Sequence, residues 1–156
     1  MQLRRYLHTV GVALHPIVVE RFIAAPAERI FDVLADPAQH PAIDGGGTLR
    51  AAEDGNPVRL SNGARFGMDM KLGAPYRITN KVVEFEEARR IGWRHFNGHV
   101  WRYVLSPADG GTLVREEWDP TNAKNQLVVR LLGFPRRNRR AMTHTLVKLD
   151  ALVTGH

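Results

Sequence analysis

The stretch that decides the fold is IVVERFIAAPAERIFDVLADPAQHPAI, residues Ile17–Ile43. Its apolar residues alternate at first, as in a half-buried strand, and the alternation drifts toward Ile23. Pro26 then predicts a helix start, because the fixed φ of proline suits the first helical turn. Apolar residues three and four apart within Ile30–Leu34 give that helix one buried face. Pro37 ends it ahead of a second short helical turn, because the residue before a proline is pushed out of the α region.

The pattern of alternating apolar residues and turn signals in the middle of the chain predicts an antiparallel meander of about six strands. Arg65–Leu72 alternates most cleanly and puts four apolar side chains on one face, which indicates a half-buried strand. Asn97-Gly98 is the strongest short hairpin signal, because both residues tolerate the positive φ of a tight turn. The strands are expected near Thr48–Ala52, Arg65–Leu72, Tyr76–Phe85, Arg89–Phe96, His99–Ser106 and Thr112–Trp118, with a break at Gly73-Ala74-Pro75.

The last part of the chain, from about Pro135 to Val153, has the apolar period of a helix. Its arginines gather on one face, and Asn138 and Thr145 are polar exceptions on the other. The apolar segment Leu127–Leu132 before it predicts a short helix or a lid. The apolar face of the long helix consists of Met142, Leu146, Leu149, Leu152 and Val153.

This order of elements indicates an α+β fold. A strand, two short helices, a strand-rich middle and one long final helix together wrap a curved sheet of about six to seven strands around a helix, with a cavity between them. A chain of 156 residues is long enough for one real core and too short for two comfortable ones. We therefore expect a single domain over residues 17–154.

Residues 1–16 are expected to form an N-terminal extension. Arg4 and Arg5 ahead of a short apolar stretch resemble a signal peptide, but His8 and Thr9 interrupt that stretch. An extension, or a start codon placed too early, is the preferred interpretation. No run in the sequence approaches the roughly 18 to 20 apolar residues that span a bilayer.

The composition is that of an ordinary globular protein, with 44% hydrophobic and 24% charged residues. The chain has no cysteine, which excludes disulfides, thiolate catalysis and cysteine-based zinc sites, and fits a cytoplasmic location. The net charge of +6 allows acidic partners without specifying one.

Taken together, the chain resembles the START/SRPBCC superfamily, which has the helix-grip fold, and in particular its polyketide cyclase/dehydrase-like branch. The resemblance covers most of residues 17–153 and is carried by IAAPAERIFDVLADP (Ile23–Pro37), VVEFEEARRIGWRHF (Val82–Phe96), GHVWRYVLSP (Gly98–Pro107) and GTLVREEWD (Gly111–Asp119). It implies a cavity between the curved sheet and the C-terminal helix that holds a hydrophobic small molecule. The superfamily includes lipid carriers, hormone receptors and cyclases, so the fold does not define the function.

Candidate ligand-binding residues are those expected to face this cavity. They combine apolar and aromatic walls with a few polar groups, as ligand pockets do, although plain core packing explains the apolar ones equally well. Asn138 has the alternative role of capping the final helix. The candidates are Phe66, Met68, Met70, Asn80, Trp93, His95, Trp101, Tyr103, Trp118, Asn138, Met142 and Thr145.

Candidate catalytic residues, if the protein is an enzyme, are His95, Glu116 and Tyr103. Cyclase chemistry on a polyketone needs a general base and a constraining cavity. His95 or Glu116 would be the base, and Tyr103 would polarise a carbonyl. Two alternatives stay open: His95 is a structural histidine, or Glu116 is solvated. Arg102 and Arg115 are possible partners of Glu116, although strand parity places both on the opposite face.

No metal site and no cofactor are expected. The seven histidines show no HxxxH spacing within one helix and no HxH, although His95 and His99 could meet across the hairpin turn. The glycines at 45–47 match no phosphate-binding pattern. The basic run Arg136–Arg140 could suggest nucleic acid or an anionic membrane, but it has no interleaved aromatic residues, and a solvated outer face is the preferred interpretation.

Three functions follow, in order of preference. The first is a binding or carrier protein for a hydrophobic or aromatic, lipid- or polyketide-like molecule. The second is a polyketide cyclase or dehydratase acting in the same cavity. The third is a protein-interaction module that uses the basic helix face. Whether two copies form a homodimer is left open.

Overall fold

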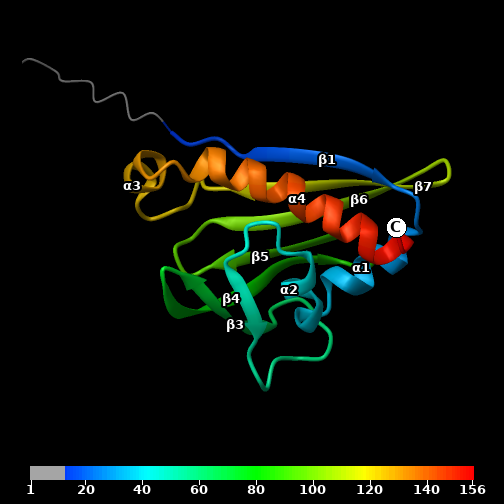
Figure 1. Ribbon diagram of the computed structural model, residues 1–156, viewed down its shortest axis with the longest axis horizontal. Helices are drawn as coiled ribbons and strands as arrows, with labels where there is room; N and C mark the ends of the chain where they lie inside the picture. Colours follow the sequence, from blue (N-terminus) through cyan, green and yellow to red (C-terminus); the bar gives the residue numbers. More distant parts are fainter. Residues whose placement is uncertain (1–12) are drawn as a thin grey trace, which may run out of the picture.

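The protein consists of one seven-stranded antiparallel sheet crossed by a long C-terminal helix, as seen in a computed structural model that describes residues 13–156 (Figure 1). The sheet order is β1-β7-β6-β5-β4-β3-β2, so consecutive strands are neighbours except that the first strand joins the last. The strands are β1 (Ile17–Ile23), β2 (Leu49–Ala52), β3 (Arg65–Leu72), β4 (Ala74–Glu86), β5 (Arg90–His95), β6 (Val100–Ala108) and β7 (Gly111–Asp119). The helices are α1 (Ala27–Leu34), a short 3₁₀ turn (Pro37–Gln39), α2 (His40–Ile43), α3 (Gln126–Leu131) and α4 (Phe134–Thr154). This arrangement confirms the expected α+β helix-grip fold.

The opening stretch forms the elements that its pattern predicts. Helix α1 begins directly after Pro26, and the apolar face of Ile30, Phe31 and Leu34 is fully buried. The side chain of Asp36 accepts a hydrogen bond of 3.0 Å from the amide of the second residue of the 3₁₀ turn, and so caps this turn. The helix pair therefore turns back toward the sheet immediately after β1.

The meander differs from prediction at the turn between β3 and β4. We expected Gly73-Ala74-Pro75 to break the sheet, but only Gly73 does so, with a φ of +73° that favours glycine. Ala74 and Pro75 already belong to β4, where Pro75 lies opposite Lys71 near the strand's start. A proline is tolerated there because the first residues of a strand need not donate to the ladder. The hairpin at Asn97-Gly98 is confirmed.

Helix α4 buries four of the five apolar residues assigned to its inner face, and Leu152 is the exception. Met142, Leu146, Leu149 and Val153 are at most 2% exposed, whereas Leu152 is 42% exposed. At about 100° per residue, Leu152 lies roughly 90° from the mean direction of the other four and therefore on the flank of the helix. The prediction for Leu152 was wrong because the apolar face is narrower than we assumed.

The predicted extension, residues 1–16, lies largely outside the described residues. Leu14 is described and is 8% exposed, in a cluster with Ile17, Trp118, Val129 and Met142. The chain is therefore already packed against the domain just before β1.

Candidate functional site

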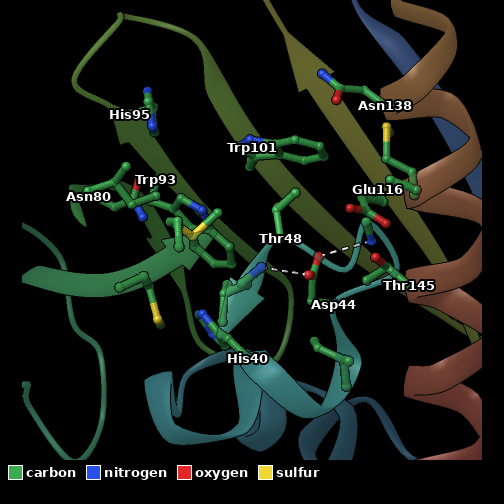
Figure 2. Close-up of a pocket in the computed structure, with 18 of the residues that line it drawn as sticks. His40, Asp44, Thr48, Asn80, Trp93, His95, Trp101, Glu116, Asn138 and Thr145 are labelled. Atoms are coloured by element: carbon green, nitrogen blue, oxygen red, sulfur yellow. Dashed lines mark hydrogen bonds between the residues drawn. The ribbon is translucent and has the colours of Figure 1, made fainter. Parts of the chain in front are cut away.

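A cavity of about 210 Å³ lies between the sheet and α4, where the resemblance predicts one. Its walls come from β2 to β7, from the first half of α4, and from α2 with the loop 44–48 that follows it. Figure 2 shows side chains from these three sources converging: Glu116 and Trp101 from the sheet, Asn138 and Thr145 from α4, and His40 with Asp44 from α2 and its loop.

Most residues that the sequence marked as ligand contacts line this cavity. They come from five strands and one helix, so the fold brings together positions that are up to 79 residues apart, from Phe66 to Thr145. The predicted residues at the cavity wall are Phe66, Met68, Met70, Asn80, Trp93, His95, Trp101, Tyr103, Glu116, Asn138, Met142 and Thr145.

Trp118 is the predicted contact that lies elsewhere. It is 2% exposed and belongs to a separate cluster with Leu14, Ile17 and Val129. It shares strand parity with Glu116, as expected, but this end of β7 is covered by α3 and the segment before β1. Parity gives the face of a strand and not the position along it, so Trp118 was assigned to the correct face and the wrong end.

The sequence analysis missed the contribution of α2 and the loop after it. His40, Ile43, Asp44 and Thr48 line the cavity, and so does Leu49 at the start of β2. His40 is 5% exposed, its ring stacks on Trp93 at 5.0 Å between centroids, and its Nε2 lies 2.8 Å from the carbonyl oxygen of Leu34. The available signal was a histidine next to Pro41 in an apolar helical turn, a pattern too common to identify a site.

The aromatic wall of the cavity is continuous. Phe66 meets Trp93 edge-on at 5.5 Å between centroids, and Trp93 lies 5.7 Å from Tyr103. Burial lowers the pKa of His40, so this ring is neutral at pH 7 and serves as part of the wall. Aromatic pairs at these distances prefer such edge and tilted arrangements. The wall therefore presents both ring faces and ring edges to an occupant.

Tyr103 and Glu116 form the polar centre of the cavity. They are cross-strand neighbours on β6 and β7, and the Tyr103 hydroxyl donates to Glu116 Oε1 at 3.0 Å. Glu116 is 2% exposed, so it is not the solvated side chain that we kept as an alternative. Burial raises the pKa of Glu116 from 4.5 to about 8, with a smaller contribution from the charge of Asp44, while the Tyr103 hydrogen bond acts in the opposite direction. Glu116 is therefore mostly a neutral acid at pH 7.

Two buried oxygens at the cavity wall lack a hydrogen-bond partner within residues 13–156. They are Glu116 Oε2 and Asn80 Oδ1, on side chains that are 2% and 4% exposed. Buried polar atoms are normally satisfied, because an unpaired one costs about 1–3 kcal/mol. These two atoms are thus the positions at which an occupant of the cavity can form hydrogen bonds.

The arginines that we considered as partners of Glu116 lie on the outer face of the sheet, as parity predicts. Arg102 forms ion pairs with Glu84 and Glu117, and Arg115 pairs with Glu117. The cross-strand ladder places this network on the opposite side of β6 and β7 from Tyr103. The charges on the outer face therefore pair with one another, and the hydrogen-bond partner of the Glu116 carboxyl on the inner face is Tyr103.

The two histidines at the β5–β6 hairpin do meet. The rings of His95 and His99 stack at 4.4 Å between centroids. Burial lowers the pKa of His95 to about 4, and burial together with the charge of His95 lowers that of His99 to about 3. Both rings are neutral at pH 7. His95 lines the cavity and is only half-buried, which places it at the cavity's rim. Within residues 13–156, no three histidine or carboxylate side chains gather as a metal site would require.

The loop 44–48 is held against α4 by unusually close contact at Gly45. Its amide donates to Thr145 Oγ1 at 3.0 Å, and a Cβ atom at this position would lie 2.2 Å from the carbonyl oxygen of Ala141. Asp44 shapes the same loop by accepting hydrogen bonds from the amides of Gly46 and Leu49. The backbone of the loop therefore touches the backbone of the helix and closes this end of the cavity.

Gly45→Ala is expected to lower the free energy of unfolding by about 2–3 kcal/mol, because the added methyl group must push the loop from α4. Urea denaturation monitored by circular dichroism measures this. Gly46→Ala is the matched control, since its Cβ would meet only ordinary contacts of 3.4 Å and more. An equal loss in both variants would contradict the close contact.

Comparison with known proteins agrees with this description. Residues 15–154 match the family model described as polyketide cyclase/dehydrase and lipid transport. A Mycobacterium tuberculosis protein, named uncharacterized protein Rv0088, is 39% identical over 139 residues, which are 82% of this chain and 59% of the relative. The chain thus spans about three fifths of the length of that curated relative.

Solved structures share the fold at low sequence identity. Protein Ms6760 from Mycobacterium smegmatis aligns with a TM-score of 0.68 and 21% identity over 90% of this chain and 91% of its own. The AHSA1-like protein from Aeromonas hydrophila aligns with a TM-score of 0.63 and 18% identity over 90% of this chain and 94% of its own.

None of the helices in residues 13–156 is long and apolar enough to cross a membrane. Fold and family model agree, and the chain belongs to the polyketide cyclase/dehydrase and lipid transport family of the START/SRPBCC superfamily.

Proposed function

We propose that the protein binds an apolar, ring-containing small molecule that carries a hydrogen-bonding oxygen, and that it acts as a binding or carrier protein. The observation that carries this proposal is the pair of unpartnered buried oxygens, Glu116 Oε2 and Asn80 Oδ1, at the wall of an otherwise aromatic and apolar cavity. A cavity of this kind, with few polar groups among apolar walls, is typical of small-molecule sites.

The chemistry of the two oxygens specifies the ligand further. Because the pKa of Glu116 is about 8, its carboxyl is protonated at pH 7 and donates a hydrogen bond through the oxygen that does not accept from Tyr103. Asn80 Oδ1 only accepts. A ligand with a carbonyl or hydroxyl oxygen near Glu116 and a donor near Asn80 would satisfy both side chains.

The size of the cavity limits the part of the ligand that is enclosed. An apolar cavity of about 150 Å³ is enough to hold benzene. About 210 Å³ therefore accommodates a substituted aromatic ring or a short alkyl segment, and a longer molecule would extend through the rim near His95 and Asn138. Methionines at positions 68 and 70 let the wall adapt to irregular shapes.

Ala141→Phe is expected to weaken binding of N-phenylnaphthylamine, an uncharged fluorescent probe, by about tenfold or more, equivalent to about 1.4 kcal/mol. Ala141 lines the cavity, so the added ring occupies the ligand's space. Val147→Phe is the matched control, because Val147 is on the same helix and 45% exposed. Fluorescence titration measures both, and unchanged binding in Ala141→Phe would refute this cavity as the site.

Identification of the natural ligand requires the protein from its own host. Native mass spectrometry of that material, followed by extraction, is expected to reveal a bound ring-containing compound with at least one oxygen. A co-purified ligand that is charged and lacks apolar surface would contradict the proposal.

A second candidate function, a cyclase or dehydratase acting in the same cavity, is favoured by one observation. Glu116 has a pKa of about 8 and is hydrogen-bonded to Tyr103, and a group that titrates near the working pH is the most effective acid or base. The ionised fraction of Glu116 would take a proton from a polyketone methylene, and Tyr103 would turn its hydroxyl hydrogen bond from Glu116 to the carbonyl oxygen of the resulting enolate. His95 stands at the rim and is less well placed for this step.

The enzyme hypothesis is tested by incubating the protein with a linear polyketone and following its disappearance by mass spectrometry. Turnover that is lost in Glu116→Gln but retained in Val147→Phe would establish it. Binding of the polyketone without turnover in the native protein would leave the carrier function alone.

A further inference from the structure

Helix α3 and the residue after it expose four aliphatic side chains on one surface. Val129 is 8% exposed and anchors the helix in the cluster with Trp118 and Met142. The others face outward, and their exposed fractions are far above those of the protein core. We call this set the α3 surface; it comprises Leu127 (68% exposed), Val128 (51%), Leu131 (75%) and Leu132 (67%).

Basic residues flank the α3 surface in the sequence. Between Asp119 and Asp150 the sequence contains no acidic residue and seven Lys or Arg residues, which exceeds the net charge of +6 of the entire chain. Arg130 lies within α3, and Arg136 and Arg140 follow in the first turns of α4; all three are exposed. Such a concentration of one charge beside exposed leucines is not the random scatter of an ordinary surface.

The α3 surface lies beside the cavity. In Figure 1, α3 is at the end of the molecule where α4 begins, beyond the ends of the strands. Phe134 and Arg137 in the first turn of α4 line the cavity, only two and five residues after Leu132. A partner that covers the α3 surface would therefore also lie next to the part of the cavity wall formed by Phe134 and Arg137.

The combination of aliphatic and basic side chains selects the partner. Leucine and valine enter the acyl boundary of a bilayer, while neighbouring arginines extend their guanidinium groups to lipid phosphates. A second copy of the chain would bring the same arginines against one another across a two-fold axis. Binding of nucleic acid would not bury the four exposed aliphatic side chains, and the α3 surface contains no aromatic residue on which bases could stack.

We propose that the α3 surface docks on an anionic lipid bilayer, with the four aliphatic side chains inserted at the headgroup level and the neighbouring Arg130, Arg136 and Arg140 on lipid phosphates. The protein then rests on the membrane with its cavity rim close to the lipid phase, where apolar molecules are concentrated. This inference concerns a surface separate from the cavity walls, so it does not depend on the proposed ligand.

Vesicle flotation tests the proposal with the full-length chain. The protein is expected to float with vesicles of one part phosphatidylglycerol to two parts phosphatidylcholine, and to stay at the bottom with phosphatidylcholine alone. Added salt is expected to weaken the binding, because it screens the exposed arginines. No flotation with the anionic vesicles at low salt would overturn the proposal.

Two pairs of variants separate insertion from simple charge attraction. Leu131→Ser with Leu132→Ser is expected to weaken vesicle binding about tenfold or more per leucine, and Val58→Ser, at a 90% exposed position in the loop between β2 and β3, is expected to leave it unchanged. Arg136→Gln with Arg140→Gln is expected to weaken it about fivefold per arginine. Arg90→Gln with Arg94→Gln, on exposed positions of β5, is the charge-matched control.

All substituted positions are exposed, so thermal melting curves are expected to match that of the native protein and to exclude loss of folding. Vesicle binding that is unchanged in Leu131→Ser/Leu132→Ser would refute docking by α3. So would vesicle binding that is weakened equally in Arg136→Gln/Arg140→Gln and in the control Arg90→Gln/Arg94→Gln. Either result would indicate non-specific adsorption of a basic protein. Dimer formation that disappears in Leu131→Ser/Leu132→Ser, measured by light scattering without vesicles, would assign the surface to a second copy and would also refute it.

Discussion

Glu116→Gln is expected to be more stable than the native protein at alkaline pH, and the advantage grows by about 5 kcal/mol between pH 4.5 and pH 8, because the pKa of Glu116 is about 8 in the folded state against an ordinary 4.5. Between these values the unfolded chain has an ionised Glu116 and the folded protein a neutral one. The folded state then binds the additional proton, so its stability falls as the pH rises. Above pH 8 both states are ionised and the loss stops.

The measurement is a series of urea denaturation curves for both proteins across this pH range. The difference in the free energy of unfolding between the two proteins isolates Glu116, because both contain the same buried histidines. The histidines themselves change stability with pH in the opposite direction. Their pKa values are lowered in the folded state, so they reduce stability as the pH falls below 6.5. Glutamine has the shape of glutamate, and its oxygen still accepts the hydrogen bond of Tyr103.

A difference between the two proteins that stays constant with pH would show that Glu116 keeps its ordinary pKa and is solvated. Tyr103→Phe provides a further control. The hydrogen bond from Tyr103 lowers the pKa of Glu116, so its removal is expected to raise that pKa further and to extend the pH range over which stability falls. A lowered pKa in Tyr103→Phe would contradict the geometry of the pair.

Trp118→Ala is expected to lower the free energy of unfolding by about 3–5 kcal/mol, the cost of emptying a large buried aromatic site. Trp118 is 2% exposed, and its ring joins the end of β7 to Leu14, Val129 and Met142. It fills the second core and not the ligand cavity. Binding of N-phenylnaphthylamine by the folded fraction is therefore expected to be unchanged within about twofold.

Trp101→Ala is the matched comparison, because Trp101 is half-buried and lines the cavity. It is expected to lose less stability and more probe binding than Trp118→Ala. Guanidinium denaturation and fluorescence titration of both variants measure the two quantities on the same samples. If Trp118→Ala lost probe binding and kept its stability, our original assignment of Trp118 as a ligand contact would be restored.

The local elements of this protein could be predicted from sequence because they depend on short-range physics. Alternation at Arg65–Leu72, the positive φ of Gly98, and the proline that precedes α1 each act within a few residues. The parity of Glu116 and the expected contact of His95 with His99 follow from the same short-range rules, and both are present in the structure.

The composition of the site depended on contacts between distant segments. Ile17 pairs with Trp118, which lies 101 positions later in the sequence, and no local pattern specifies which strand the first strand joins. The same pairing, with α3 and the segment before β1, covers the end of β7 and removes Trp118 from the cavity. His40 reaches Trp93 only because the helix pair turns back onto the sheet.

The sequence by itself therefore determined the elements, the fold class and the face on which most cavity residues lie, since strand and helix periods are properties of neighbouring residues. Only the tertiary structure decided the position of each residue along that face. It paired Glu116 with Tyr103 and closed one end of the cavity by the contact of Gly45 with α4. It also left the leucines of α3 exposed, with no residue within 13–156 covering them. Burial and its electrostatic consequences arise from atoms that the fold brings together, and for this reason they cannot be obtained from a local pattern.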